Sequence, residues 1–152
     1  MSDSPSGSSH EEDVAAALAR LRHHVESSEF HAWAGLELVS VDVGEVEVAL
    51  PLKPHHLNPG GILHGGLIAT LADTAIGLAV RSALPADRTH VTAQLDVHFL
   101  ERVDHGTVRA IGRAVRVGGK MAYGEGDVRD EDGRLVARAS GTFIVLPERR
   151  RP

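Results

Sequence analysis

One segment, residues 67–84, restricts the fold strongly, because its side chains are apolar almost all the way round a helix. Such a helix is normally central in a protein and covered on most sides. At 1.5 Å per residue it would span roughly 27 Å, and Pro85 would end it. The rest of the chain must therefore supply a layer that surrounds one helix. The apolar positions are Leu67, Ile68, Ala69, Leu71, Ala72, Ala75, Ile76, Leu78, Ala79 and Val80.

The rest of the chain alternates apolar and polar side chains with the period of two that predicts β-strands. Turn signals at Gly118-Gly119 and at residues 130–133 separate the last three of these strands, which is typical of hairpins. We therefore expect an α+β fold in which an antiparallel sheet of five or six strands wraps around one long central helix. The predicted strands are residues 36–43, 46–50, 90–99, 107–117, 121–129 and 135–146.

The predicted strand 90–99 has an unusual polar face. Unbroken alternation would place Val91, Ala93, Leu95, Val97 and Phe99 on one face, and His90, Thr92, Gln94, Asp96 and His98 on the other. A face that mixes threonine, glutamine and aspartate with two histidines is not typical of a solvent face. A sheet wrapped around one helix also leaves its other face and its edges to be covered. These features predict oligomerisation, with a site at the boundary between subunits.

A length of 152 residues suits one domain and is too short for two domains with normal cores. We expect a disordered N-terminal tail over residues 1–12, a helical arm over 13–35, one main domain over 36–147 and a loose charged tail over 148–152. In the arm, Asp13 is expected to cap a helix that begins near Val14. Phe30 and Trp33 are expected to end the arm by packing against the main body.

Composition excludes several classes of function. With 16 basic and 21 acidic residues the net charge is −5, whereas a nucleic-acid-binding face needs a basic excess. The chain has no cysteine, hence no disulfide, thiolate zinc site or cysteine nucleophile. No segment approaches the roughly 20 apolar residues that span a bilayer, and no secretory signal begins the chain, so we expect a cytoplasmic protein without a membrane partner. Serine-hydrolase elbow, P-loop and dinucleotide-binding sequences are absent, and no cofactor is expected.

Asp73 is the most informative single residue. It falls in the middle of the predicted central helix among apolar neighbours, where aspartate has poor helix propensity. A buried and unpaired carboxylate would cost several kcal/mol, and catalysis at a cleft is one reason to retain it. The alternative is that Asp73 belongs to a narrow exposed strip with Thr70, Thr74 and Arg81. The residues alone leave both interpretations open.

His64-Gly65-Gly66 precedes the helix and forms a second candidate site. Two glycines let a ligand approach the backbone closely. The first N–H groups of a helix are free, and the helix dipole favours negative charge near them, so this end could polarise a carbonyl oxygen. A flexible entry to the helix is the alternative explanation.

The other polar residues have ordinary explanations. Asn58 lies in a Pro- and Gly-rich loop, where its default role is to form a turn through its own side chain. Arg113, Arg116 and Lys120 flank a glycine turn and could meet phosphates, although a solvated hairpin is the commoner explanation. The chain has ten histidines, but their spacing matches no metal signature, so we predict no metal site.

The segment from Asn58 to Asp73, NPGGILHGGLIATLAD, resembles the signature of hotdog-fold thioesterases of the phenylacetic-acid-degradation (PaaI-like) type. The shared pattern is an asparagine, His-Gly-Gly and then an acidic residue on the central helix. The order of elements also fits, with strands, a long helix and a run of antiparallel strands. The resemblance covers residues 36–146 and leaves the N-terminal arm outside. A sister group has glutamate at the helix position, so aspartate indicates the PaaI-like side.

The resembled family hydrolyses acyl-coenzyme A thioesters, and its roles can be carried over by position. The resemblance implies that Asp73 is the catalytic carboxylate, either as nucleophile or as general base on water. It implies that the Gly66 N–H polarises the thioester carbonyl, while Gly65 shapes the approach. His64 and Asn58 would orient the thioester or the water.

The resemblance also implies contributions from a second copy and from a binding turn. Thr92 matches a position that reaches the site from the neighbouring subunit. Arg116, Gly118, Gly119 and Lys120 match a turn that lies near the coenzyme A nucleotide. Relatives are dimers, often assembled into tetramers, so we expect a homotetramer or a dimer that binds acyl-CoA at the subunit interface.

Other functions stay open at this stage. A non-catalytic hotdog module that binds acyl-CoA as a signal would usually carry a DNA-binding domain and lack the helix carboxylate. A hotdog dehydratase or hydratase would pair Asp with His, or His with Glu, near a Gly/Pro loop, and the spacing of His64 and Asp73 matches this poorly. A plain interaction domain is the third alternative. The acyl group also stays open among aryl-acetyl, benzoyl-like and medium-chain groups.

Overall fold

The computed structural model describes residues 8–149, and residues 1–7 and 150–152 lie outside the described part. The helices are α1 (Ser8–Glu26), α2 (Glu29–Ala34) and α3 (Gly65–Ala83), and a short 3-10 turn spans Pro54–His56. The strands are β1 (Glu37–Asp42), β2 (Glu45–Pro51), β3 (Arg88–Phe99), β4 (Thr107–Val117), β5 (Met121–Arg129) and β6 (Leu135–Pro147).

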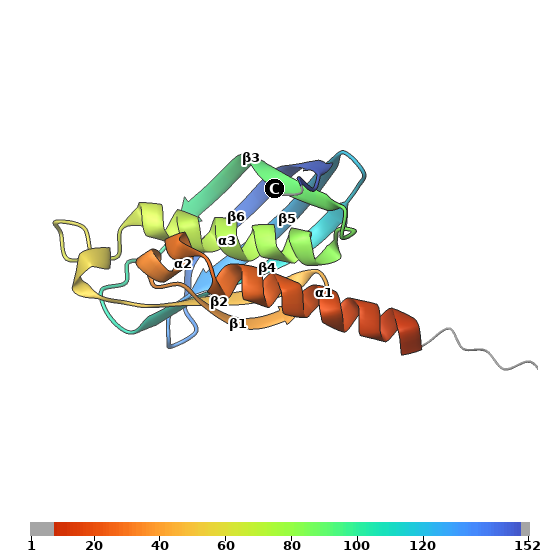
Figure 1. Cartoon of the computed structure of the whole chain (residues 1–152). Helices are drawn as coiled ribbons and strands as arrows, with labels where there is room; N and C mark the ends of the chain where they lie inside the picture. The colour runs from red at the N-terminus through yellow and green to blue at the C-terminus, as the bar shows by residue number, and fades with distance from the viewer. Residues whose placement is uncertain (1–7, 150–152) are drawn as a thin grey trace, which may run out of the picture.

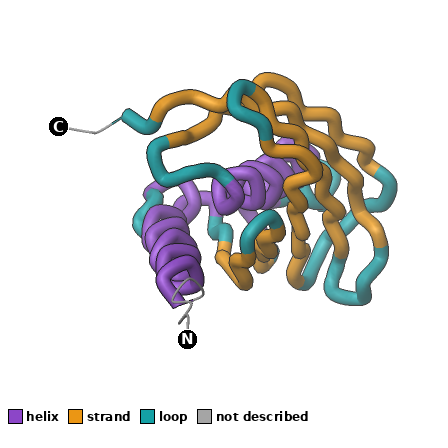
Figure 2. The backbone as a smooth tube through the Cα atoms, turned by 90° about the vertical axis from the view of Figure 1, so that its right-hand side faces the viewer, coloured by secondary structure: helices purple, strands orange, loops and turns teal. Residues whose placement is uncertain are grey.

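The six strands form one antiparallel sheet in the order β1-β2-β4-β5-β6-β3. The sheet curves around α3 (Figure 1). Figure 2 shows the strands on one side of this helix and α1 beside its open side. The predicted α+β hotdog architecture is therefore confirmed. Strand β3, with 12 residues, lies at one edge of the sheet with no neighbour beyond it in the described chain.

The core forms where α3 presses on the middle of the sheet. Ala75 and Ile76 of α3 are fully buried. Strand β4 meets the helix at Gly112, where an added Cβ would lie only 2.2 Å from the backbone carbonyl carbon of Ala75. Gly124 of β5 meets Ile76 in the same way, at 2.5 Å from its Cγ2 atom. Glycine at position 112 lets the helix backbone lie directly on β4, and glycine at position 124 leaves room for the Ile76 side chain.

The helix α3 corrects one expectation from the sequence. With 19 residues, it is long and apolar enough by length and composition to cross a membrane, whereas we expected no segment to approach that limit. Half of its most apolar window is buried inside the fold. Its apolar surface is thus used largely in the protein core.

The N-terminal arm differs from its prediction in two respects. The helix α1 begins at Ser8, so at least residues 8–12 are helical and the predicted start near Val14 is wrong. The side chains of Phe30 and Trp33 are 51% and 74% exposed, so they do not anchor the arm as expected. Instead Leu21 and Val25 of α1 are buried against the core, at 8% and 3% exposure. Their spacing of one helical turn places both on one face of α1.

The C-terminal segment is attached to the fold where the structure describes it. The backbone N–H of Glu148 donates to the carbonyl of Asp87 at 2.8 Å, and its carboxylate pairs with Arg81 at 3.4 Å. The loose tail that we expected from residue 148 therefore does not begin there, and residues 150–152 lie outside the described part.

A β-bulge in β3 breaks the alternation that the sequence indicated. Thr92 pairs with Phe143 of β6, whereas Gln94 pairs with the next residue, Thr142, so Ala93 is the extra residue. Thr92 before the bulge and Leu95 after it both face α3, as their contacts with Asp73 and the core show. The two predicted faces therefore exchange at Ala93, because a bulge shifts the side-chain direction by one residue.

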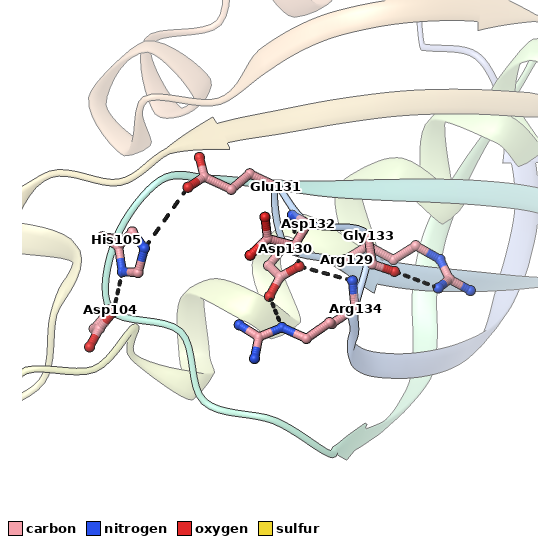
Figure 3. Close-up of polar contacts among 8 residues, drawn as sticks. All are labelled: Asp104, His105, Arg129, Asp130, Glu131, Asp132, Gly133 and Arg134. Carbon is pink, nitrogen blue, oxygen red and sulfur yellow. Dashed lines mark hydrogen bonds and ion pairs between the residues drawn. The ribbon is translucent and has the colours of Figure 1, made fainter.

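The β5–β6 turn is held by one buried carboxylate (Figure 3). The Asp130 Oδ1 atom accepts the N–H groups of Asp132 and Arg134 at 3.0 and 2.9 Å, and Oδ2 accepts Arg134 Nε at 2.8 Å. Burial alone would raise the pKa of Asp130, but the hydrogen bonds from Arg134 outweigh it and hold the pKa below its ordinary value. On β5, a hydrogen bond from Arg138 likewise holds the pKa of Asp127 below its ordinary value.

We expect the free energy of unfolding to decrease as the pH falls below about 4, the ordinary carboxyl value. The pKa values of Asp127 and Asp130 are lower in the folded chain, so the unfolded chain binds protons first as the pH falls. The two carboxylates contribute fully to the free energy of unfolding at pH values above the ordinary carboxyl pKa. This contribution is lost as the pH falls through the lowered pKa values of the folded chain. Urea midpoints measured from about pH 7 to pH 3 should fall more steeply for the wild type than for Asp130→Asn. Parallel curves would contradict this assignment.

Candidate active site

Asp73 lies in the middle of α3 and faces away from the sheet core, half-buried rather than enclosed. Its Oδ1 atom accepts a hydrogen bond at 2.9 Å from the hydroxyl of Thr92 on β3. This contact is made within one chain, so Thr92 does not need to come from a neighbouring subunit as the resemblance implied. The hydrogen bond fixes the carboxylate and leaves its second oxygen available for chemistry.

Asp73 lines a large groove with a volume of about 1400 Å³. Thr74, Gly77 and Arg81 line the same groove, so the polar strip that the sequence suggested is real. This strip lines a groove. Asp73 therefore belongs to a polar strip and also lies at a cleft, and the two interpretations of the sequence are compatible. Thr70, by contrast, donates its hydroxyl to the Gly66 carbonyl at 2.9 Å.

At the start of α3, the backbone N–H group that is free to bind a substrate is not the one expected. His64 is the N-cap residue, and its Nδ1 atom accepts the Gly66 N–H at 2.9 Å. The donor expected at Gly66 is therefore occupied. The Gly65 N–H has no hydrogen-bond partner among residues 8–149, so Gly65 is the open donor at this end of the helix. The sequence could not show this, because it does not define the orientation of the His64 ring.

The ring of Phe99 packs against Gly65. A Cβ added to Gly65 would lie 3.3 Å from Phe99 Cε1. Phe99 is 55% exposed at the end of β3, so it offers an apolar surface beside the helix start. Sequence alternation placed Phe99 on the face opposite to Thr92, and only the bulge at Ala93 reveals that both face α3.

Asn58 shapes the loop that leads into α3. Its Oδ1 atom accepts the N–H groups of Gly60 and Ile62 at 2.9 and 3.3 Å. The predicted turn-forming role is therefore confirmed. This carboxamide oxygen is used within the loop, and the structure does not bring Asn58 into contact with Asp73.

His90 is a neighbour of the site that the sequence did not single out. Its ring packs against Gly77 of α3, where an added Cβ would lie 3.2 Å from His90 Cε1, and it meets Phe143 edge-on at a centroid distance of 5.0 Å. Burial lowers the pKa of His90, which favours the neutral ring near neutral pH. The sequence signal for this residue was its position on the same face as Thr92, two residues away.

The predicted coenzyme A turn lies at a second cavity, of about 450 Å³. Arg116, Gly118 and Lys120 line it together with Tyr123 and Thr142, whereas Gly119 is not among its lining residues. Two cations at one small cavity can bind phosphate groups. In residues 8–149 we find no group of three His, Asp or Glu side chains that could hold a metal ion.

Asp73 and the open donor are too far apart to act on one carbonyl within one chain. Asp73 lies eight positions after Gly65 in the helix, which is about 12 Å along the axis. A nucleophile lies about 3 Å from the carbonyl carbon, and an oxyanion donor about 3 Å from its oxygen. Asp73 and the Gly65 N–H of one chain therefore do not reach the same carbonyl group.

Comparison with known proteins identifies the family. A family model described as the thioesterase superfamily matches residues 60–137, which is just over half of the chain and includes the helix and both glycines at its start. The chain belongs to the thioesterase superfamily. It is a hydrolase that acts on thioester bonds.

Several known proteins are similar to the chain over most of their length. A Saccharolobus solfataricus protein named as a candidate esterase is 32% identical and covers 73% of this chain and 79% of its own. The 1,4-dihydroxy-2-naphthoyl-CoA hydrolase of Listeria monocytogenes is 27% identical, with 76% of this chain and 94% of that protein covered. The crystal structure of a Haemophilus influenzae thioesterase has a TM-score of 0.78 at 25% identity and covers 86% of this chain and 90% of that one.

Proposed function

We propose that this superfamily member is an acyl-CoA thioesterase of the PaaI-like type, with Asp73 as its catalytic carboxylate. The observation that carries the proposal is the position of Asp73, which is held by Thr92 on the helix face that lines the large groove. A carboxylate fixed by one hydrogen bond and open to a cavity is placed to attack or to activate water.

The reaction requires an attack on the thioester carbonyl and departure of the thiolate. Asp73 either adds to the carbonyl carbon itself, giving an anhydride that water then opens, or takes a proton from the attacking water. Negative charge develops on the carbonyl oxygen, and the Gly65 N–H at the positive end of the helix dipole stabilises it. The C–S bond then breaks and coenzyme A leaves as a thiolate, which is a fair leaving group and needs no strong general acid.

We further propose that each site combines Asp73 of one copy with the start of α3 of another. The separation of about 12 Å along one helix supports this arrangement. The open edge of β3 supports it as well, because a long strand with unpaired backbone groups is suited to pair with a second strand. Pairing of two β3 edges would build a dimer, and two dimers would build the expected homotetramer.

The coenzyme A moiety is assigned to the cavity at the β4–β5 turn. Arg116 and Lys120 supply two positive charges for its phosphates, and Tyr123 supplies an aromatic surface. The Listeria relative acts, by its name, on an aromatic acyl-CoA. This supports a CoA thioester as substrate without choosing the acyl group.

Thiol release from a panel of acyl-CoA thioesters tests the proposal. The panel should include phenylacetyl-, hydroxybenzoyl-, short-chain and medium-chain thioesters, and the wild type should release free coenzyme A from at least one of them. A folded protein that binds coenzyme A but releases no thiol from any thioester would instead support the non-catalytic binding module.

Replacing Thr92 by valine should lower kcat about tenfold, because a hydroxyl hydrogen bond to a charged carboxylate such as Asp73 is worth about 1.5 kcal/mol. Thr92→Ser retains the hydroxyl and should stay within about threefold of the wild type. Steady-state thiol release checks both variants. Equal losses in the two variants would contradict this role for the hydrogen bond, because Thr92→Ser retains the hydroxyl.

A further inference from the structure

The large groove beside Asp73 has one wall that lies outside the residues matched by the family model. The arm, helices α1 and α2, supplies that wall, and α3 with the start of β3 and the end of β6 supplies the other. Figure 2 shows α1 beside the open side of α3, where the sheet does not cover it. The apolar side chains that line the groove include Ala17, Leu21, Phe30, Leu78, Leu84 and Leu146.

The arm is fixed firmly enough to act as a wall. Val25 is 3% exposed, Leu21 is 8% exposed, and both belong to the core that also contains Leu36. Ala17 lies one turn before Leu21 on the same face of α1, so its small side chain leaves room in the groove. The ring of Phe30 lines the groove from α2 and remains 51% exposed.

The groove has a reactive end and a polar limit. Asp73 and Thr92 meet at the reactive end. Farther along α3, the Arg81–Glu148 ion pair joins the helix to the end of β6 at 3.4 Å. Arg81 lies eight positions after Asp73, which is about 12 Å along the helix axis. Between these two positions the walls expose more apolar than polar surface, although Arg20, His24 and His31 of the arm also line the groove.

The chemistry of the two cavities indicates which part of a thioester each one holds. The cations Arg116 and Lys120 line the smaller cavity, which suits the phosphates of coenzyme A. The groove beside Asp73 joins the catalytic carboxylate to walls whose exposed surface is more apolar than polar, which suits an apolar group that extends from the carbonyl.

We propose that the N-terminal arm determines acyl specificity, because Ala17, Leu21 and Phe30 hold an apolar acyl group of medium length in the groove beside Asp73. This inference rests on the proposed thioesterase function and adds the part of the chain that selects the substrate. The size of the side chain at position 17 sets the width of the groove, and the Arg81–Glu148 pair limits its length.

Ala17→Phe tests this proposal, and Ala16→Phe is the matched control because Ala16 lies on the exposed side of the same helix. The assay is thiol release from straight-chain thioesters, from acetyl-CoA to lauroyl-CoA. We expect kcat/KM of Ala17→Phe to fall at least about tenfold for octanoyl and longer chains and to stay within about twofold for the shortest thioester cleaved. Ala16→Phe should match the wild type on every chain.

A second measurement separates failure of this inference from failure of the proposed function. Binding of octanoyl-CoA and free coenzyme A is measured by calorimetry in the catalytically disabled Asp73→Asn background. Ala17→Phe should weaken binding of octanoyl-CoA about tenfold and leave binding of coenzyme A unchanged. Equal effects on all chain lengths would overturn the inference, as would no effect on any chain. A changed oligomeric state of Ala17→Phe would also overturn it, because the groove would then hold a second copy of the chain.

Discussion

Replacing Asp73 by asparagine is expected to lower kcat for thiol release by about a thousandfold or more. Asparagine has the same shape, and its carbonyl oxygen can still accept the hydrogen bond from Thr92. The change removes the negative charge, and with it both the nucleophile and the general base. The binding of coenzyme A should stay unchanged, because Asp73 does not line the cavity at the β4–β5 turn.

The matched control for this variant is Asp42→Asn, which removes the same charge at an exposed position at the end of β1. It should retain wild-type turnover and unfold at the wild-type temperature. Near-normal turnover in Asp73→Asn would show that another group carries the chemistry. An equal loss in both variants would show that net charge, and not the position of Asp73, controls the rate.

Gly112→Ala is expected to cause a large loss of stability. An added Cβ would lie 2.2 Å from the carbonyl carbon of Ala75 and 2.4 Å from the backbone nitrogen of Ile76. Backbone atoms in the middle of α3 cannot move aside as a flexible side chain would, so the helix must shift from the sheet. Overpacking of a core typically lowers the free energy of unfolding by about 1–3 kcal/mol. Because this clash is with backbone atoms, we expect a loss of about 3 kcal/mol or more. A loss of about 3 kcal/mol would lower Tm by about 10 °C.

Gly119→Ala is the matched control for Gly112→Ala. No atom lies within 4 Å of a Cβ added to Gly119, and its φ is not positive, so the change should alter Tm by no more than about 2 °C. Both variants are compared with the wild type by thermal and urea unfolding. An unchanged Tm in Gly112→Ala would mean that α3 does not rest on β4 as closely as the structure shows.

The sequence predicted the elements whose patterns are local. The apolar residues 67–84 predicted the central helix, and the period of two predicted each of the six strands to within a few residues. The bulge at Ala93 could not be predicted in this way, because it depends on how β3 pairs with β6 and not on its own residues. The close contact between Gly112 of β4 and the backbone of α3 could not be predicted either. A glycine inside a strand does not indicate which element packs against that face of the sheet.

The site was predictable as a set of residues and not as an arrangement. Asp73 was conspicuous because a carboxylate in an apolar helix needs an explanation, and its contact with Thr92 gives one. The sequence predicted Gly66 as the free N–H donor, whereas the structure leaves the Gly65 N–H free. This difference depends on the orientation of the His64 ring, which accepts the Gly66 N–H and cannot be read from a residue pattern. The groove needs α1, α3 and β3 together, so only the tertiary structure could show that Ala17 and Asp73 line the same groove.

The most direct test of the shared site combines two inactive variants. Gly65→Pro removes the open N–H, and proline fits the first position of a helix, where the extended backbone of His64 suits the residue before a proline. Asp73→Asn disables the other half of the site. Each variant alone should lack thioesterase activity.

The two variants are co-expressed with different affinity tags, and mixed dimers are purified through both tags. A site built from Asp73 of one copy and Gly65 of the other is intact once in each mixed dimer, so about half of the wild-type activity should return. Mixed dimers that stay as inactive as their parents would contradict a thioesterase site shared between two copies.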